Sequence, residues 1–428
     1  MSILKSPAIE EQIIHLIEDM TQDWDLDLES DITLNEELIA DLSFSSVDFV
    51  QLFVNIEECF GKKLGFHDLL MQNGKYIDDL SVAQLVSFVD GKLNSRSFKT
   101  GISSGNSITT SQLSNQLTLE QIKQFHQSIP APAINLDRET LKNPRAIFLL
   151  SPSRSGSTLL RVMLAGNSQL FAPPELHLLM YRNLADRKAS LANELNRHLL
   201  NGTVRAIMAM KDCNAGEAQQ LMAQLEEKNL TTKEFYNFLQ EGLGRRILVD
   251  KTPSYSYHID LLRRAEAEFT EPLYIHLVRH PYGTIRSFED AKLHRLLPFM
   301  QSDKFSSRQY AELAWLICHQ NIKNFLADVP ENRQLRVKFE DLVSQPQNTI
   351  TAICNFLGVN FQQEMLEPYQ EKNQRMTDGV EVVSKMSGDL KFHLHQTIDS
   401  SMADRWQKYH AEDFLCETSR EMARELGY

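Results

Sequence analysis

The chain has 428 residues and a formal net charge of −13, a length that predicts two or three domains with an ample hydrophobic core. Residues 1–96 contain 6 of the 44 basic and 19 of the 57 acidic residues, which leaves 38 of each for the rest of the chain. Because the excess acidity lies in one segment and no segment has an excess of basic residues, we expect at least two domains and no nucleic-acid partner.

The cysteines and the apolar runs indicate the compartment. The five cysteines are scattered and form no Cys-x-x-Cys pair, a pattern typical of reduced cytosolic thiols rather than of a disulfide framework or a zinc site. No apolar run approaches the length of a membrane span, and the N-terminus lacks the regions of a signal peptide. None of the 13 histidines stands in a His-Glu-x-x-His motif. The sequence therefore predicts a cytoplasmic protein with no membrane contact and no metal.

Residues 1–93 are predicted to form a small, acidic, all-α bundle. Apolar residues recur at helical spacing in three segments, with Gly61 placed to end the second helix: residues 9–20, 47–60 and 82–93. We also expect a short extra turn near residues 66–71.

The segment Asp41-Leu-Ser-Phe-Ser-Ser-Val-Asp48, at the start of the second helix, resembles the attachment site of acyl and peptidyl carrier proteins. In that family a serine in Gly-x-Asp-Ser-Leu carries 4′-phosphopantetheine, and the match places that role on Ser46. A helix N-terminus suits a phosphodiester because its free N–H groups and its dipole favour negative charge. Ser43 and Ser45 replace the usual Gly and Asp, so Ser45 is the alternative attachment site. The other alternative is that Ser46 is only a helix N-cap.

Residues 94–117 are rich in Ser, Thr, Gly, Asn and Gln, and we predict that they form a flexible linker with a typical span of about 25–30 Å. Tethering at that reach gives an effective concentration on the order of millimolar, so a linked carrier could supply a downstream enzyme. A lead-in helix is expected over residues 119–129, where Pro130 and Pro132 end it.

Residues 118–428 are predicted to fold as an α/β domain. Four segments are strand candidates, with helical segments between them: residues 146–150, 246–250, 273–278 and 335–339. Alternation of this kind predicts a mostly parallel sheet with helices on both faces. Ligands of such sheets bind beyond the carboxyl ends of the strands.

The first of these strands leads into Ser151-Pro-Ser-Arg-Ser-Gly-Ser-Thr158 and then a helix. Gly156 lets the backbone approach a ligand, the helix start offers free N–H groups, and Arg154 adds a cation, so we expect a phosphate or sulfate here. The alternative is a structural turn with a surface arginine. No lysine follows Gly156, which disfavours a kinase or ATPase.

This loop resembles the 5′-phosphosulfate loop of sulfotransferases, which bind 3′-phosphoadenosine 5′-phosphosulfate (PAPS). The resemblance implies a P-loop-like sulfotransferase fold and places PAPS on Arg154, Ser155, Gly156, Ser157 and Thr158. A second strand–turn–helix unit ends its strand at Arg279 and has Ser287 eight residues later. Sulfotransferases hold the 3′-phosphate of PAPS with such a pair. Their cofactor loop falls near Lys391 and Arg405, which we also predict to bind PAPS.

Three further residues are predicted to carry the chemistry, together with Arg154. Pro-Pro-Glu175-Leu-His177 resembles the glycosaminoglycan branch of sulfotransferases, in which the Glu is the base. In an extended segment Glu175 and His177 would face the same way, and which of the two is the base stays open. Lys251, in Lys-Thr-Pro-Ser-Tyr255, is expected to neutralise charge on the sulfuryl group.

A carrier (1–93), a linker (94–117) and a sulfotransferase (118–428) resemble the paired domains of polyketide synthases that form terminal alkenes. The resemblance implies sulfation of the β-hydroxyl of a carrier-bound acyl chain and release of 3′-phosphoadenosine 5′-phosphate (PAP), which prepares the chain for decarboxylation. Polyketide synthase modules and a thioesterase are the implied partners. No Gly-x-Ser-x-Gly thioesterase motif follows the sulfotransferase segments, so we expect the thioesterase on another chain, or this chain to be an excised didomain. The alternatives are a sulfotransferase for a freestanding alcohol or sugar, an inactive docking or scaffold protein, and, more remotely, a phosphotransferase.

Overall fold

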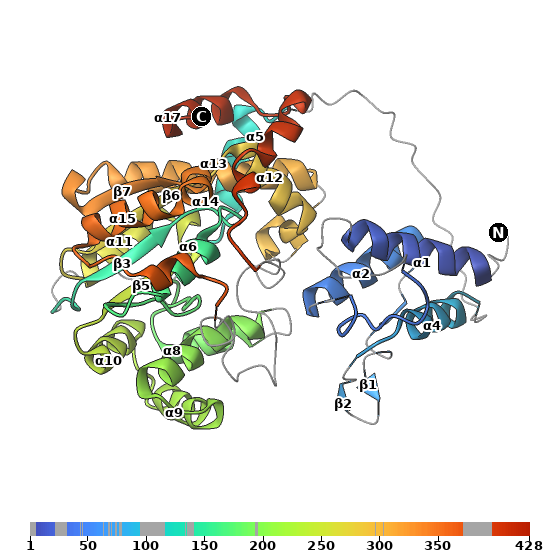
Figure 1. The fold of residues 1–428 in the computed structure, drawn as a ribbon, viewed down its shortest axis with the longest axis horizontal. Helices are drawn as coiled ribbons and strands as arrows, with labels where there is room; N and C mark the ends of the chain where they lie inside the picture. The colour runs from blue at the N-terminus through green and yellow to red at the C-terminus, as the bar shows by residue number, and fades with distance from the viewer. Residues whose placement is uncertain are drawn as a thin grey trace. The chain divides into compact units, whose positions relative to one another are not determined.

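A computed structural model divides the chain into two compact units, residues 1–113 and 114–428, which are described separately below (Figure 1). The boundary falls within the segment predicted as a linker. The structure describes residues 6–21, 32–42, 44, 46–62, 64–66, 69, 71–72, 75–76, 79–94, 116–132, 134, 141–192, 196–295, 297–302, 304–370 and 396–428. Most of the predicted linker, Ser43, Ser45 and Lys391 therefore lie outside the described residues.

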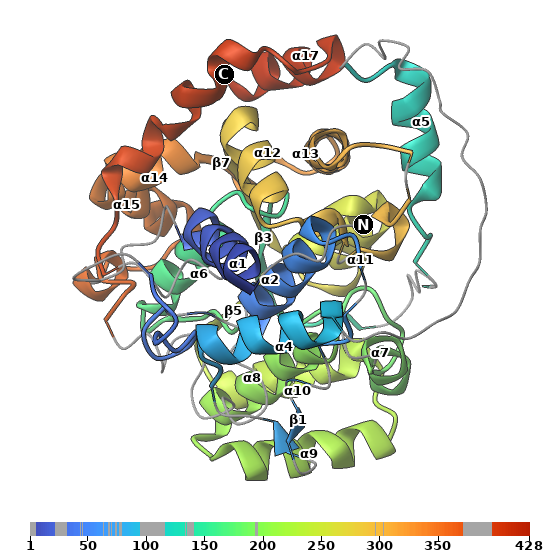
Figure 2. The same cartoon turned by 90° about the vertical axis from the view of Figure 1, so that its right-hand side faces the viewer.

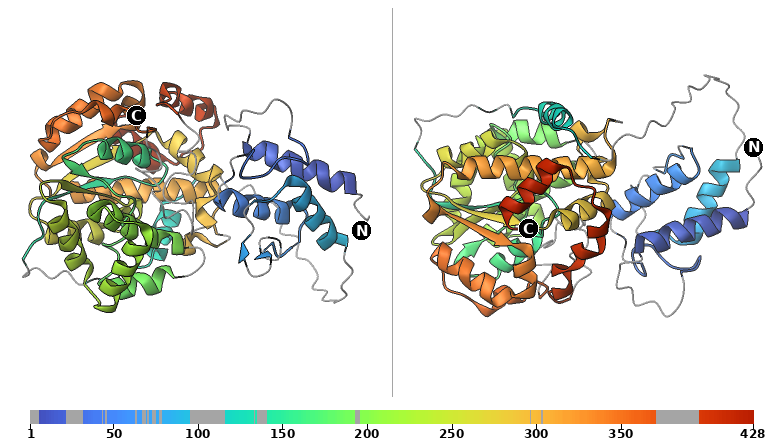
Figure 3. Two further views of the ribbon diagram at one scale, coloured as in Figure 1. Left: turned by 60° about the horizontal axis from the view of Figure 1, so that its bottom comes forward. Right: turned by 90° about the horizontal axis from the view of Figure 1, so that it is seen from above.

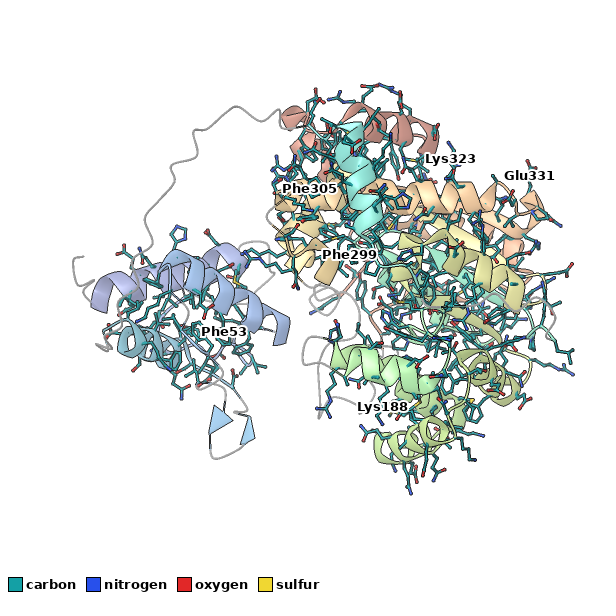
Figure 4. The ribbon with its side chains drawn as sticks, turned by 180° about the vertical axis from the view of Figure 1, so that it is seen from behind. Phe53, Lys188, Phe299, Phe305, Lys323 and Glu331 are labelled. Carbon is teal, nitrogen blue, oxygen red and sulfur yellow. The ribbon has the colours of Figure 1, made fainter. Side chains whose placement is uncertain are left out.

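The N-terminal unit packs three amphipathic helices around an apolar core: α1 (Ser6–Thr21), α2 (Ser46–Cys59) and α4 (Val82–Asn94). The helical repeat places Ile13 of α1, Ile56 of α2 and Leu85 of α4 in that core. Phe53, labelled in Figure 4, stacks on Phe66 with ring centroids 4.2 Å apart. After Phe66 the chain forms a two-residue antiparallel pair, β1 (Met71–Gln72) with β2 (Lys75–Tyr76), beside the region where the sequence predicted only a turn.

The second unit is built on a five-stranded sheet in which every pairing is parallel, in the order β4-β5-β3-β6-β7. The strands are β3 (Ala146–Leu150), β4 (Leu170–Phe171), β5 (Ile247–Lys251), β6 (Leu273–Val278) and β7 (Gln334–Lys338). The four predicted strands are confirmed to within one residue at each end. The edge strand β4 was missed because two residues are too short to show an apolar pattern.

Alternate residues of the central strand β3 face two different apolar cores. Phe148 and Leu150 lie in the core with α8 (Asn201–Lys211), α10 (Thr232–Leu243) and α11 (Ile259–Glu268). Ile147 and Leu149 lie in the core with α6 (Ser157–Ala165), α14 (Phe339–Ser344) and α15 (Pro346–Leu357). In the left view of Figure 3 the green helices α8–α10 and the orange helices α14 and α15 lie at opposite sides of the sheet. The prediction of helices on both faces is confirmed.

A third apolar core joins segments that are far apart in sequence: α5 (Leu119–Ser128), α12 (Pro281–Asp290), α13 (Ser307–Leu326) and α17 (Glu417–Leu426). Thr118 caps α5 in a capping box with Gln121, which sets where this predicted lead-in helix begins. Phe125 of α5 contacts Phe299 and Phe305, and Figure 4 shows both beside that helix.

The remaining described elements are peripheral helices. Two are α-helical, α7 (Leu184–Leu191) and α9 (Ala215–Glu227), and Figures 1 and 2 show α8, α9 and α10 grouped on the side of the sheet where β5 lies. The short 3₁₀ helices are η1 (Arg197–Leu200), η2 (Pro253–Tyr257), η3 (Leu293–Arg295), η4 (Pro298–Met300), η5 (Glu331–Arg333), η6 (Gln363–Leu366), η9 (Ser400–Ala403) and η10 (Arg405–Glu412). No helix in the described parts of the chain is long and apolar enough to cross a membrane.

Candidate active site

The loop after β3 turns sharply before it enters α6. Arg154 has φ +68° and Gly156 has φ +82°, both in the left-handed region. A Cβ atom at position 156 would lie 2.2 Å from the ring of Phe339, so only glycine allows the loop to pack this closely. The helix that follows begins at Ser157, and its free N–H groups therefore face the end of the strand.

The hydroxyl groups of this loop are buried beside the helix start. The Ser155 Oγ atom has no hydrogen-bond partner among the described residues, and Ser155 is fully buried. Ser157 and Thr158 are the first two residues of α6 and are also buried. A buried hydroxyl without a partner is costly, so the Ser155 hydroxyl is suited to receive a bound anion.

The loop after β3 and the helix after β6 touch directly. Arg154 Nε donates a hydrogen bond to Ser287 Oγ at 3.1 Å, and Arg279 Nη1 donates one to the Arg154 carbonyl at 3.0 Å. The Arg279 guanidinium also lies 4.4 Å from the centroid of the Phe339 ring. The structure thus brings the two predicted phosphate-binding units into one cluster that contains two arginines.

The segment after residue 400 packs against the same region. Helix η10, which begins at Arg405, contacts α12, the helix that carries Ser287. Trp406 stacks on His280 with ring centroids 3.7 Å apart and an interplanar angle of 7°. Arg405 Nη1 lies 3.7 Å from the Met402 sulfur. Arg405 is therefore placed near the predicted cofactor region, whereas Lys391 lies outside the described residues.

Lys251, at the end of β5, joins the predicted base to the loop after β3. Its Nζ donates to Glu175 Oε1 at 2.5 Å and to Thr158 Oγ1 at 3.4 Å. On the other side of the same carboxylate, His177 Nε2 lies 3.2 Å from Glu175 Oε2. The Lys251 side chain is 1% exposed and that of Glu175 is 22% exposed, so the carboxylate has the more open position.

The charge of Glu175 is set by these neighbours. Burial by itself would raise the pKa of Glu175, but the charges of Lys251 and His177 and the hydrogen bonds from both outweigh it and hold the pKa below its usual value. Glu175 is therefore a carboxylate at neutral pH, paired with the Lys251 ammonium, which also contacts Thr158.

The predicted extended geometry of residues 175–177 is wrong at one position. His177 has φ +49°, outside the extended region, although its side chain does meet that of Glu175. The close approach of α8 shapes this segment, because a Cβ atom at Gly202 would lie 1.9 Å from the Glu175 carbonyl oxygen. Nothing in the local sequence indicates that contact, since it depends on the tertiary packing of a helix 27 residues away.

Sequence reasoning also missed buried residues behind the site. Arg161 of α6 is fully buried and donates to the Ala172 carbonyl at 2.9 Å. Burial and the charge of Arg205 lower the pKa of Arg161 to about 10, against the opposite effect of Glu175. Asp250 and Tyr255 were also missed, although both lie in the segment that contains Lys251. In the described residues no group of three His, Cys, Asp or Glu side chains is placed to hold a metal ion.

Comparisons with known proteins give the family. Residues 144–363 match the model of the sulfotransferase family. Among solved structures, the chain is similar to the sulfotransferase domain from the curacin biosynthetic pathway, with 40% identity and a TM-score of 0.62 over 67% of this chain and 99% of that one. It is also similar to the sulfotransferase domain from the Synechococcus PCC 7002 olefin synthase, with 35% identity and a TM-score of 0.60 over 69% of this chain and 99% of that one.

A comparison with curated proteins found no match. The family match spans the parallel sheet and the loop after β3, and it includes the residues around Glu175, Lys251 and Arg279. The two similar domains support the same family, because they are 40% and 35% identical to this chain and the similarity covers 99% of each. The chain belongs to the sulfotransferase family, and its second unit is a sulfotransferase enzyme.

Proposed function

We propose that this enzyme transfers a sulfuryl group from PAPS to the β-hydroxyl of an acyl chain attached to its own N-terminal unit. One observation carries the proposal. The Lys251 ammonium contacts both the Glu175 carboxylate, a proton acceptor, and Thr158 at the start of the anion-binding helix. Proton removal and charge neutralisation are therefore available within one group of side chains, as sulfuryl transfer requires.

The residues around the loop after β3 suit a nucleotide with two anionic ends. Arg154 and Arg279 supply fixed cations, the start of α6 supplies N–H groups, and the Ser155 hydroxyl has no partner among the described residues. Arg279 and Ser287 each contact Arg154, and their position after β6 supports a second phosphate at the end of that strand. We therefore propose PAPS as the donor and PAP as the product.

The roles follow from the charges. Glu175 accepts the proton of the acceptor hydroxyl as its oxygen forms a bond to sulfur, while the bond from sulfur to the phosphate oxygen of PAPS breaks. That oxygen keeps the electron pair and leaves as part of PAP. Lys251 and Arg154 balance the negative charge that develops on the sulfuryl group and the leaving phosphate. His177, 3.2 Å from Glu175, positions the acceptor or shares the proton.

The N-terminal unit supports a carrier-bound acceptor. It is a helical bundle whose second helix begins at Ser46, the residue in the position of the phosphopantetheine-bearing serine. The two similar domains are named for a biosynthetic pathway and an olefin synthase. We therefore propose residues 1–93 as an acyl carrier, with a β-hydroxyacyl chain on 4′-phosphopantetheine at Ser46. Polyketide synthase modules would supply this chain, and a thioesterase would consume the sulfated product.

The test loads the full-length chain with a β-hydroxyacyl phosphopantetheine, adds PAPS and follows the intact mass. We expect one added arm and then one added sulfuryl group, both absent in Ser46→Ala and retained in Ser45→Ala. Glu175→Gln should load normally but gain no sulfate. Equal rates for the free β-hydroxy acid and the loaded chain would instead favour a freestanding acceptor, and loading of Ser46→Ala would disprove the assigned serine.

A further inference from the structure

The Tyr255 phenol lies behind the segment that carries Glu175 and His177. Its oxygen accepts hydrogen bonds from two consecutive backbone N–H groups, those of Leu178 at 2.8 Å and Leu179 at 3.3 Å. Its O–H donates to Asp250 Oδ2 at 3.2 Å. Tyr255 is 2% exposed and Asp250 is 1% exposed, so the arrangement is shielded from water.

We propose that Tyr255, oriented by Asp250, is a positioning residue that fixes the backbone next to His177 and so sets the relative placement of His177 and Glu175. Tyr255 does not touch the reacting groups, and it acts through the two N–H groups that follow His177. The proposal rests on the function proposed above, because it assumes that Glu175 and His177 handle the acceptor hydroxyl.

The hydrogen-bonding capacity of a phenol explains why two residues are needed. A tyrosine hydroxyl has one proton to donate and lone pairs that accept. When the Tyr255 O–H donates its hydrogen bond to Asp250, the lone pairs of Tyr255 are directed to the N–H groups of Leu178 and Leu179. Asp250 is itself fixed, because Thr252 donates to its other oxygen at 2.8 Å and Tyr236 also donates to Oδ2. The carboxylate therefore determines which way the Tyr255 hydroxyl points.

The segment needs such support because His177 is held in a left-handed conformation. A histidine with φ +49° is unfavourable and persists only where the surroundings impose it. Arg187 Nε donates to the Leu176 carbonyl at 3.1 Å, just before His177, and Arg264 Nη1 donates to the Leu179 carbonyl at 2.8 Å. These arginines hold carbonyl groups, whereas Tyr255 holds the N–H groups between them.

The last two residues of β5 have different partners. Lys251 points to the Glu175 carboxylate, and its neighbour in sequence, Asp250, points to Tyr255 on the opposite side of the strand, as alternate residues of a strand do. The last two residues of β5 therefore act on the same segment, Lys251 through the Glu175 side chain and Asp250 through the backbone after His177.

The test compares Tyr255→Phe with Tyr274→Phe in the full-length chain. Tyr274 is also fully buried and donates to a carboxylate, that of Glu266 at 2.9 Å, but it lies on β6 away from the segment. The measurements are kcat for sulfation of the loaded carrier, KM for PAPS, PAP affinity by calorimetry and the melting temperature.

We expect Tyr255→Phe to lower kcat by about 10–100-fold, because a misplacement near 1 Å can cost on the order of a hundredfold. KM for PAPS and PAP affinity should stay at the wild-type values, since the loop after β3 is untouched. Tyr255→Phe and Tyr274→Phe should lower the melting temperature by similar amounts, but in Tyr274→Phe kcat should stay unchanged. Equal kcat values for the two variants would overturn the proposal, as would a Tyr255→Phe defect that appears only in KM for PAPS.

A second variant covers the case in which Tyr255→Phe does not fold. Asp250→Asn keeps the size of the side chain but no longer requires the Tyr255 proton, and it should lower kcat without changing PAP affinity. Wild-type kcat in Asp250→Asn would count against the proposal. Failure of the proposed function looks different, because the wild-type chain would then transfer no sulfate to the loaded carrier, and both proposals would fall together.

Discussion

Arg154 Nε donates a hydrogen bond to Ser287 Oγ at 3.1 Å, although the sequence patterns place these residues at opposite ends of one nucleotide. The contact joins the loop after β3 to α12 across the ends of two neighbouring strands. A guanidinium has five N–H donors in a fixed fork, so Arg154 can keep Ser287 and still bind an oxyanion. In the function proposed above, Ser287 would therefore both orient Arg154 and offer its hydroxyl to the ligand.

Ser287→Ala tests this double role. The variant removes a hydrogen bond to a charged group, which is worth about 1.5–3 kcal/mol, and we expect PAP affinity to fall about tenfold or more. Calorimetric titration with PAP measures the change. Ser128→Ala is the control, because the Ser128 hydroxyl makes a hydrogen bond elsewhere, donating to the Phe125 carbonyl of α5 at 2.7 Å. Equal PAP affinities for the two variants would contradict the role of Ser287.

The pairing of Glu175 with Lys251 predicts how activity depends on pH. Because Lys251 and His177 together outweigh burial and lower the pKa of Glu175, the wild-type base stays ionised well below the ordinary carboxyl pKa of about 4.3. The stabilisation from this pair is present above about pH 4.3 and is lost only as pH falls through the lower folded-state pKa. Activity should therefore show no acid limb from Glu175 near neutral pH.

Lys251→Met removes the positive charge that does most to counter the effect of burial on Glu175. The pKa of Glu175 should therefore be higher in this variant than in the wild type. We expect kcat/KM of the residual activity to fall on the acid side at a higher pH than in the wild type. Lys188→Met is the control, since the exposed Lys188 of α7, labelled in Figure 4, pairs with Glu226 of α9 at 2.5 Å. An acid limb at the same pH in Lys251→Met and the wild type would show that Lys251 does not set the charge of Glu175.

The close approach of α8 to the segment that contains Glu175 gives a third prediction. In Gly202→Ala the new methyl group would meet the Glu175 carbonyl, so the helix or the segment must move. We expect a loss of about 1–3 kcal/mol in the free energy of unfolding, typical of overpacking, together with a lower kcat. Gly216→Ala on α9 is the control, because the nearest atom there is a side-chain oxygen at 3.3 Å. That variant should be neutral or slightly more stable.

The central strands β3 and β6 could be predicted from the sequence because they are short, fully buried and mostly apolar runs. The observed ends of β3 and β6 coincide with the predicted ends of these runs. The predicted ligand-binding residues follow them, as expected at the carboxyl ends of parallel strands. The same rule brought Arg154, Arg279 and Lys251 to one edge. Local patterns therefore sufficed wherever the site residue follows a strand directly.

The support behind the site could not be predicted in this way. Tyr255 and Asp250 read as ordinary residues of a strand and a turn, and only the folded chain shows that they hold the N–H groups after His177. The left-handed backbone of His177 has no sequence signature, since glycine or asparagine would be the usual choice there. Contacts between segments about 75 residues apart depend on packing, which a single sequence does not encode locally.

A buried histidine pair predicts that acid destabilises the sulfotransferase unit. His276 Nε2 and His319 Nδ1 are 2.9 Å apart between β6 and α13. Burial, together with the charge of Arg336, lowers the pKa of His276 to about 3, and burial together with His276 and Arg336 lowers that of His319. Both are therefore neutral in the folded state at pH values where an unfolded histidine, with a pKa of about 6.5, takes up a proton.

The direction in which the free energy of unfolding changes with pH follows from proton uptake. Between about pH 6.5 and the lowered folded-state values the unfolded state binds more protons, so the free energy of unfolding falls as pH falls, by at most about 1.4 kcal/mol per pH unit for each histidine. Urea unfolding at several pH values, followed by the fluorescence of Trp315, whose ring lies 4.9 Å from that of His319, measures the slope. The double variant His276→Leu, His319→Leu should have a smaller slope, whereas the exposed control His126→Gln should keep it. An unchanged slope in the double variant would mean that the acid sensitivity arises elsewhere.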